Sequence, residues 1–90
     1  MDETIEVLGC VAKQTGGGGY QVRTPLGLVL ILRLPGEPWW SALWVPRGAR
    51  RMVLTLLGDH RTPADAAREA TRRLRAIQRT CARAAAREEA

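Results

Sequence analysis

The last third of the chain carries one unbroken helical pattern, which limits what the rest of so short a chain can build. Thr62 is a suitable N-cap, Pro63 suits the first helical position, and Asp65 in the first turn lies near the positive end of the helix dipole. No glycine or proline follows. We therefore predict a helix over about residues 63–88, which at a rise of about 1.5 Å per residue is about 37 Å long.

This helix is longer than any strand that the remaining residues can supply. A strand of five or six residues spans only about 17–20 Å, so the helix should extend beyond the sheet on which it packs. Leu74 and Ile77 carry most of the burial, whereas the end of the helix is mostly Ala, Arg and Glu and should fray or contact a partner. The apolar positions, spaced by three and four in one narrow stripe, are Ala67, Ala70, Leu74, Ile77, Cys81 and Ala84.

Apolar segments separated by glycine- and proline-rich stretches precede the helix. Pro25 and Gly27 should divide the second segment at a bulge or tight turn. The four glycines at 16–19 favour a flexible hairpin loop. A phosphate-binding loop is the less favoured alternative, because the GxxxxGK[ST] pattern is absent and no helix follows. The predicted strands cover about residues 4–13, 20–34, 39–45 and 49–57.

Ninety residues make one domain, and a chain of this length buries a single small core. The order of the elements predicts an α+β fold over residues 1–90. In this fold an antiparallel β-meander of three to five strands packs against one long C-terminal α-helix.

The alternation of side chains leaves both faces of the predicted sheet apolar. Trp40 and Trp44 share one face, whereas Trp39, Leu43 and Val45 share the other. A sheet with one solvated face should alternate polar and apolar residues, and one alanine-rich helix cannot cover both faces. Either the N-terminal segment, a second copy or another protein covers the second face, and a homodimer is the simplest answer.

Positive charge is concentrated in the second half of the chain. Residues 1–46 hold three basic and four acidic groups, for a net charge of −1, and residues 47–90 hold eleven and five, for +6. This asymmetry predicts an anionic partner, either a nucleic acid or an acidic protein surface. Thirteen of the fourteen basic residues are arginine, which a GC-rich genome would also favour, although genome composition does not explain their placement.

Arginines recur along the predicted helix in steps of three and four, so they form one row beside the apolar stripe. The row can follow a phosphate backbone or be a solvated face with internal ion pairs, of which Asp65 with Arg68 is one. Residues 68–90 hold seven arginines but three acids, so internal pairing cannot neutralise them. A second basic group surrounds the turn after the tryptophans, at Arg47, Arg50 and Arg51. The helical row is Arg68, Arg72, Arg75, Arg79, Arg83 and Arg87.

Catalysis and cofactor binding are not expected. His60 is the one histidine and lies in a polar turn beside Asp59, which is a weak metal signal. Cys10 and Cys81 are too few for a disulfide framework or metal cluster and should be small buried hydrophobes. We expect no metal, no cofactor, no small-molecule substrate and no membrane association. Without a secretory signal or a long apolar run, a cytoplasmic location is the default.

The second half of the chain resembles the AP2-type three-stranded DNA-binding domain, which also occurs as the arm-binding domain of tyrosine recombinases. The similar stretches are "GYQVR" and "WSALWVPRGARRMVLTLLGDHRTPADAAREA". Leu57-Gly58, Thr62 and Ala66-Ala67 occupy places that match the family pattern. The resemblance implies a sheet lying in the major groove. It also implies a set of residues on or near the DNA: Arg23, Trp40, Trp44, Arg47, Arg50 and Arg51.

These observations favour a small non-enzymatic nucleic-acid-binding protein of a phage or mobile element. Its arginines would hold phosphates, and DNA and RNA are equally open as targets. One alternative is a phage-encoded inhibitor that binds a host protein complex, of the anti-CRISPR type. Another is a homodimeric structural module. The candidate nucleic-acid-binding residues are Arg23, Trp40, Trp44, Arg47, Arg50, Arg51, Arg68, Arg72, Arg75 and Arg79.

Overall fold

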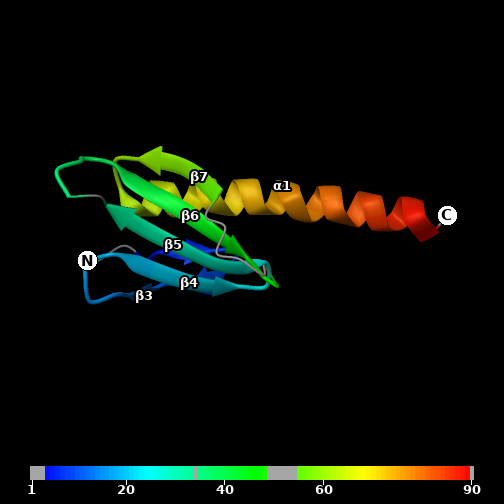
Figure 1. Cartoon of the computed structure of the whole chain (residues 1–90), viewed down its shortest axis with the longest axis horizontal. Coiled ribbons are helices and arrows are strands. Elements are labelled where there is room, and N and C mark those ends of the chain that lie inside the picture. The colour runs from blue at the N-terminus through cyan, green and yellow to red at the C-terminus, as the bar shows by residue number, and fades with distance from the viewer. Residues whose placement is uncertain (1–3, 34, 49–54, 90) are drawn as a thin grey trace.

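The computed structural model describes residues 4–33, 35–48 and 55–89 and confirms the α+β fold. Two antiparallel sheets pack against one C-terminal helix (Figure 1). The elements are β1 (Glu6–Val7), β2 (Cys10–Val11), β3 (Lys13–Gln14), β4 (Tyr20–Thr24), β5 (Gly27–Arg33), β6 (Trp40–Pro46), β7 (Thr55–His60) and α1 (Pro63–Glu89).

The larger sheet is a five-stranded meander in the order β3-β4-β5-β6-β7, and β1 and β2 form a separate hairpin. Val22 in β4 lies opposite Val29 in β5, which lies opposite Trp44 in β6. These residues therefore share one face. An irregularity between Ala42 and Leu43 shifts the register where β6 pairs with β7.

Two of the predicted strands differ from the observed ones. The segment predicted as one strand over 4–13 is broken by a turn at Leu8 and Gly9, whose φ angles are 52° and 77°. The chain therefore doubles back as the β1–β2 hairpin. The strand predicted to end at residue 57 continues to His60 as β7, because the polar end of β7 still pairs with Trp40 of β6. The predicted division of the second strand is confirmed by β4 and β5.

The core lies between one face of the meander and α1, with the N-terminal hairpin beside the helix. Ile5 and Val7 from the N-terminal segment are buried, as is Leu74 of α1. The N-terminal segment therefore packs on the same face of the sheet as α1 and does not cover the second face. The buried residues are Ile5, Val7, Val22, Val29, Ile31, Ala42, Ala64, Ala66, Ala67, Ala70 and Leu74.

The helix begins as predicted and extends beyond the sheet. The backbone N–H of Asp65 donates to Thr62 Oγ1 over 3.1 Å, which caps the first turn. Every side chain from Gln78 to Arg83 is exposed, and Figure 1 shows this part of α1 projecting past the end of the sheet. Cys81 lies there and is exposed, so its predicted burial is wrong. Cys10 is half-buried and packs against the core.

Candidate nucleic-acid interface

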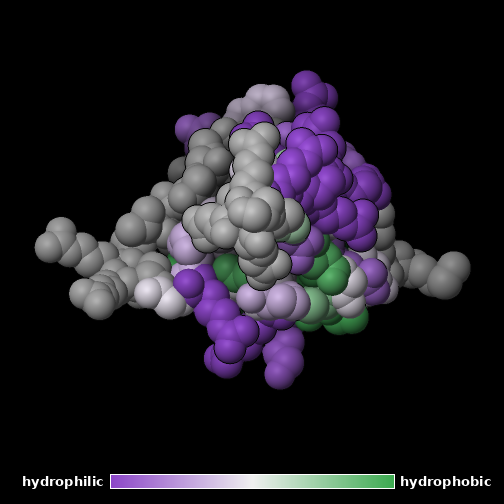
Figure 2. Space-filling view, turned by 90° about the vertical axis from the view of Figure 1, so that its right-hand side faces the viewer, coloured by the Kyte–Doolittle hydropathy of each residue, from purple (hydrophilic) through white to green (hydrophobic). Residues whose placement is uncertain are grey.

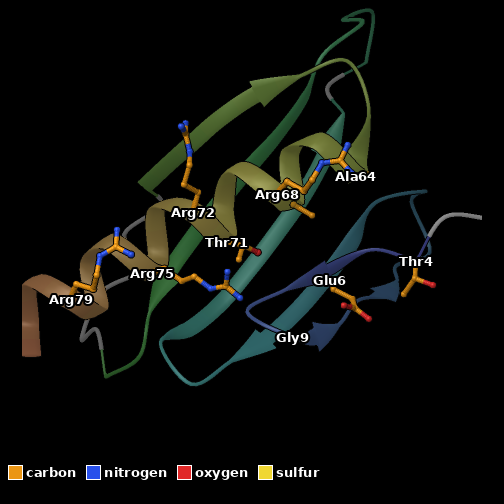
Figure 3. A pocket seen from close by; sticks show the side chains of 10 residues that line it. Thr4, Glu6, Gly9, Ala64, Arg68, Thr71, Arg72, Arg75 and Arg79 are labelled. Carbon is orange, nitrogen blue, oxygen red and sulfur yellow. The ribbon is translucent and has the colours of Figure 1, made fainter.

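Five arginines lie on one side of α1, beside the buried stripe, and are called the arginine row below. Their spacing of three and four residues keeps them on neighbouring turns of the helix. All five side chains are exposed. The first four line an open groove of about 590 Å³ between α1 and the N-terminal hairpin (Figure 3). The arginine row is Arg68, Arg72, Arg75, Arg79 and Arg83.

Acidic side chains partly neutralise the start of the row. Arg68 pairs with Asp65, and Glu69 pairs with both Arg72 and Arg73. The hydrogen bond from Arg68 lowers the pKa of Asp65, and the hydrogen bond from Arg73 lowers that of Glu69. Both carboxylates are therefore charged at neutral pH and offset part of the positive charge near the helix N-terminus.

The later part of the row forms no ion pair with the described side chains, although the exposed Glu6 lines the same groove. Among the side chains that the structure describes, which in α1 end at Arg83, no carboxylate lies within ion-pair distance of Arg75, Arg79 or Arg83. The side chains of the row diverge: Arg75 points from α1 toward the hairpin turn at Gly9, whereas Arg72 points away from the hairpin (Figure 3). Among the described side chains, the arginines of the row without an ion-pair partner therefore lie toward the part of α1 that projects past the sheet.

The N-terminal hairpin forms the second wall of the groove. The backbone N–H of Leu8 donates to Thr71 Oγ1 over 3.2 Å, which ties the hairpin turn to the middle of α1. Thr4, Glu6 and Gly9 line this wall. Sequence patterns did not indicate this wall, because the turn depends on Leu8 adopting a positive φ angle that its residue type does not signal.

Trp40 and Trp44 lie on the helix-facing side of the sheet and pack against the core. Trp44 Nε1 donates to the carbonyl of Leu26 over 3.1 Å, and the ring centroids of Trp40 and Tyr20 are 6.0 Å apart. The resemblance had placed both tryptophans at the DNA. Their strand positions point them to the side of the sheet on which α1 packs, and the contact with DNA that the resemblance implies stays a prediction.

Two arginines stack on tryptophans, which the sequence patterns had not indicated. Arg33 Cζ lies 5.9 Å from the centroid of the Trp40 ring, and Arg61 Cζ lies 5.6 Å from that of Trp39. Trp39 is 42% exposed. Alternation along β5 and β6 could have predicted the first pair, since Arg33 and Trp40 are directly opposite in the register.

Of the remaining candidate arginines, the structure describes Arg23 and Arg47, and neither lines the groove with the row. Arg23 is exposed on the face of the sheet opposite α1, across from Leu28. Arg47 is exposed just after β6, at the end of the sheet past which α1 projects. Figure 2 shows this end, with hydrophilic side chains gathered on one side of it. Arg50 and Arg51 lie outside the described residues.

The face of the sheet opposite α1, called the outer face below, is aliphatic. In the described part of the chain, α1 and the hairpin pack on the other side, and no element covers the outer face. Leu30 lies opposite Leu43, and Leu28 lies opposite Val45. Its aliphatic side chains are partly exposed and stand apart from the core: Leu28, Leu30, Leu32, Leu43 and Val45.

No described helix has the length and apolar character needed to cross a membrane. Within the ranges that the structure describes, His, Cys, Asp and Glu side chains form no group of three or more that could hold a metal ion. No protein-family model, curated protein or solved structure matches the chain.

Proposed function

We propose that the chain is a non-enzymatic nucleic-acid-binding protein that holds a phosphate backbone along the arginine row of α1. The observation that carries the proposal is the uncompensated charge of Arg75, Arg79 and Arg83. All three are exposed, and none has an acidic partner among the described side chains. Solvated surface arginines are usually interspersed with acids, whereas a phosphate-binding row needs its charges available.

The dimensions of the row suit a phosphate backbone. Arg68 to Arg83 spans about 22 Å along the helix axis. One strand of a B-form duplex carries a phosphate about every 3.4 Å, so the arginine row is as long as a stretch of about six phosphates. Arginine forms bidentate, charge-assisted hydrogen bonds with phosphate oxygens, which makes it well suited to this contact.

The helix is a better candidate for the interface than the sheet. Reading bases in a groove needs polar donors and acceptors, and the outer face offers mainly aliphatic side chains around Gln21 and Ser41. The tryptophans of β6 face the core. We therefore propose contacts with phosphates that position the protein without selecting a base sequence.

The proposal is tested by fluorescence anisotropy with a labelled 20-base-pair DNA duplex, a 20-base-pair RNA duplex and a 20-nucleotide single strand. The double variant R75Q/R79Q should weaken binding by roughly tenfold or more, because two charge-assisted phosphate contacts are lost. The matched control is R33Q/R73Q, which removes two exposed arginines that belong neither to the row nor to the outer face of the sheet.

The control should weaken binding less than about threefold, because it lowers the net positive charge of the protein without removing a contact with phosphate. Equal losses in the two double variants would show that binding follows net charge and not the row. Absence of binding to all three nucleic acids would overturn the proposed function.

A further inference from the structure

We infer that the outer face of the sheet is the interface with a second copy of this chain, packed face to face about a two-fold axis that runs along the strands. This surface lies on the opposite side of the sheet from α1, so the inference does not depend on the function proposed for the arginine row. The aliphatic residues on this face are Leu28, Leu30, Leu32, Leu43 and Val45.

The chemistry of the face is that of the inside of a β-sandwich. Five aliphatic side chains lie on adjoining strands, with the uncharged Gln21 and Ser41 at register positions beside them. An antiparallel sheet with one solvent-exposed face normally carries polar residues on that face. On β5 and β6 this polar alternation is missing apart from Ser41, and the described hairpin and helix are both on the other side.

The size of the face is near what a stable dimer needs. Five strands about 4.8 Å apart, with up to seven residues at about 3.3 Å each, make a face of about 19 by 23 Å, or about 440 Å². If each face is treated as flat, two copies would bury about 900 Å² in total. This area is close to the 1,000 Å² or so expected of a specific interface. Such sheets stack about 10 Å apart.

The charges on the face select the axis. Lys13 and Arg23 are exposed and belong to β3 and β4, at one edge of the meander. A two-fold axis along the strands through β5 places β3 and β4 over β7 and β6 of the second copy. The cations of the two copies then lie at opposite edges. An axis perpendicular to the strands would stack β4 on β4 and bring like charges together.

Trp39 supplies an anchor at one end of this face. It alternates with the core-facing Trp40, is 42% exposed and carries Arg61 against its ring. The chosen axis places Trp39 over the start of β4 in the second copy, beside its glycine loop. A side chain added at Gly17 or Gly18 would meet nothing within 4 Å, so the loop leaves room there. Trp and Arg are the residues that most often dominate binding energy at interfaces.

The arrangement also has a consequence for the arginine row, and this part rests on the proposed function. A rotation about the strand direction leaves that direction unchanged, so both copies of α1 would project past the same end of the dimer. Both arginine rows would then be available to one nucleic acid, which raises the effective concentration of the second row once the first is bound.

The test is sedimentation equilibrium of the protein alone, over about 1 µM to 1 mM. The wild type should sediment as a dimer of the 9.9 kDa chain, and Leu43→Lys as a monomer, since a charge would be buried at the centre of the interface. Ala76→Lys adds the same charge at an exposed position of α1 and should remain dimeric. Trp39→Ala should weaken association at least tenfold.

Leu43 is only partly buried, and far-UV circular dichroism of Leu43→Lys would show whether the fold is kept. Leu43→Ala is the second variant, expected to weaken the dimer without adding a charge. A wild-type monomer at 1 mM would overturn the inference, as would a dimer unaffected by Leu43→Lys and Leu43→Ala. Because no nucleic acid is present, these results stand whatever the anisotropy experiment gives.

Discussion

The backbone N–H of Leu8 donates a hydrogen bond to Thr71 Oγ1 over 3.2 Å, and this bond joins two segments 63 positions apart in the sequence. It fixes the N-terminal hairpin against the middle of α1. The groove beside the arginine row has its shape because of this contact, since Thr71 and Gly9 both line it.

Thr71→Val should therefore lower the free energy of unfolding by about 1 kcal/mol, because the Leu8 N–H loses its partner in a partly buried position. Thr71→Ser keeps the hydroxyl and should lose about half as much or less. Urea denaturation followed by circular dichroism measures both variants. A loss in Thr71→Ser as large as that in Thr71→Val would contradict this account, because it would show that the methyl group contributes as much as the hydrogen bond.

Gly27→Ala should be strongly destabilising, by at least about 2 kcal/mol. Gly27 has a φ angle of 129°, and an added Cβ would lie 2.2 Å from the carbonyl oxygen of Val45 and 2.7 Å from the backbone nitrogen of Arg47. Gly36→Ala is the control, because its φ is also positive, at 81°, but nothing lies within 4 Å. Thermal melts should show a clearly larger fall in Tm at Gly27, and similar falls would contradict the close approach.

Acidification should destabilise the protein below about pH 4. The pKa values of Asp65 and Glu69 are lowered in the folded state by hydrogen bonds from Arg68 and Arg73. The stability they contribute is therefore present above the unfolded-state pKa values, near 4, and is lost as the pH falls through the lowered folded values. Tm should be nearly constant from pH 7 to 5 and fall below pH 4, less steeply in Asp65→Asn/Glu69→Gln. An unchanged slope in that variant would contradict this assignment.

Cys81 should react with a thiol reagent in the native protein, because it is exposed on the projecting part of α1. Cys10 should react more slowly, since it is half-buried with its Sγ 3.9 Å from the carbonyl oxygen of Leu8. Alkylation followed by mass spectrometry would show one fast and one slow site, and Cys81→Ser would remove the fast one. Slow reaction at both would mean that a partner, such as a bound macromolecule, covers this part of the helix.

The helix and the order of the strands could be predicted because local chemistry determines them. Thr62 and Pro63 mark the start of α1, and Pro25 and Gly27 mark the β4–β5 turn regardless of what surrounds them. The resulting antiparallel meander against one long helix agrees with the fold predicted from the sequence.

The side of the sheet that each residue would face could not be predicted in the same way. The alternation of side chains along the strand placed Trp39 on one face and Trp40 and Trp44 on the other. Because both faces are apolar, this alternation did not indicate which of the two faces packs against α1. The apolar stripe likewise continues to Cys81, where the pattern persists although the sheet has ended. The outer face and the groove depend on how elements pack, which a local pattern does not contain.

The central claim is that the arginine row holds a phosphate backbone, and the salt dependence of binding tests it most directly. Affinity for a 20-base-pair DNA duplex, measured between about 50 and 300 mM NaCl, should fall with a slope of log K against log salt of about −3 to −5, as expected for about three to five phosphate contacts. R75Q/R79Q should reduce this slope by about two. Absence of binding at 50 mM NaCl, or a slope near zero, would contradict the claim.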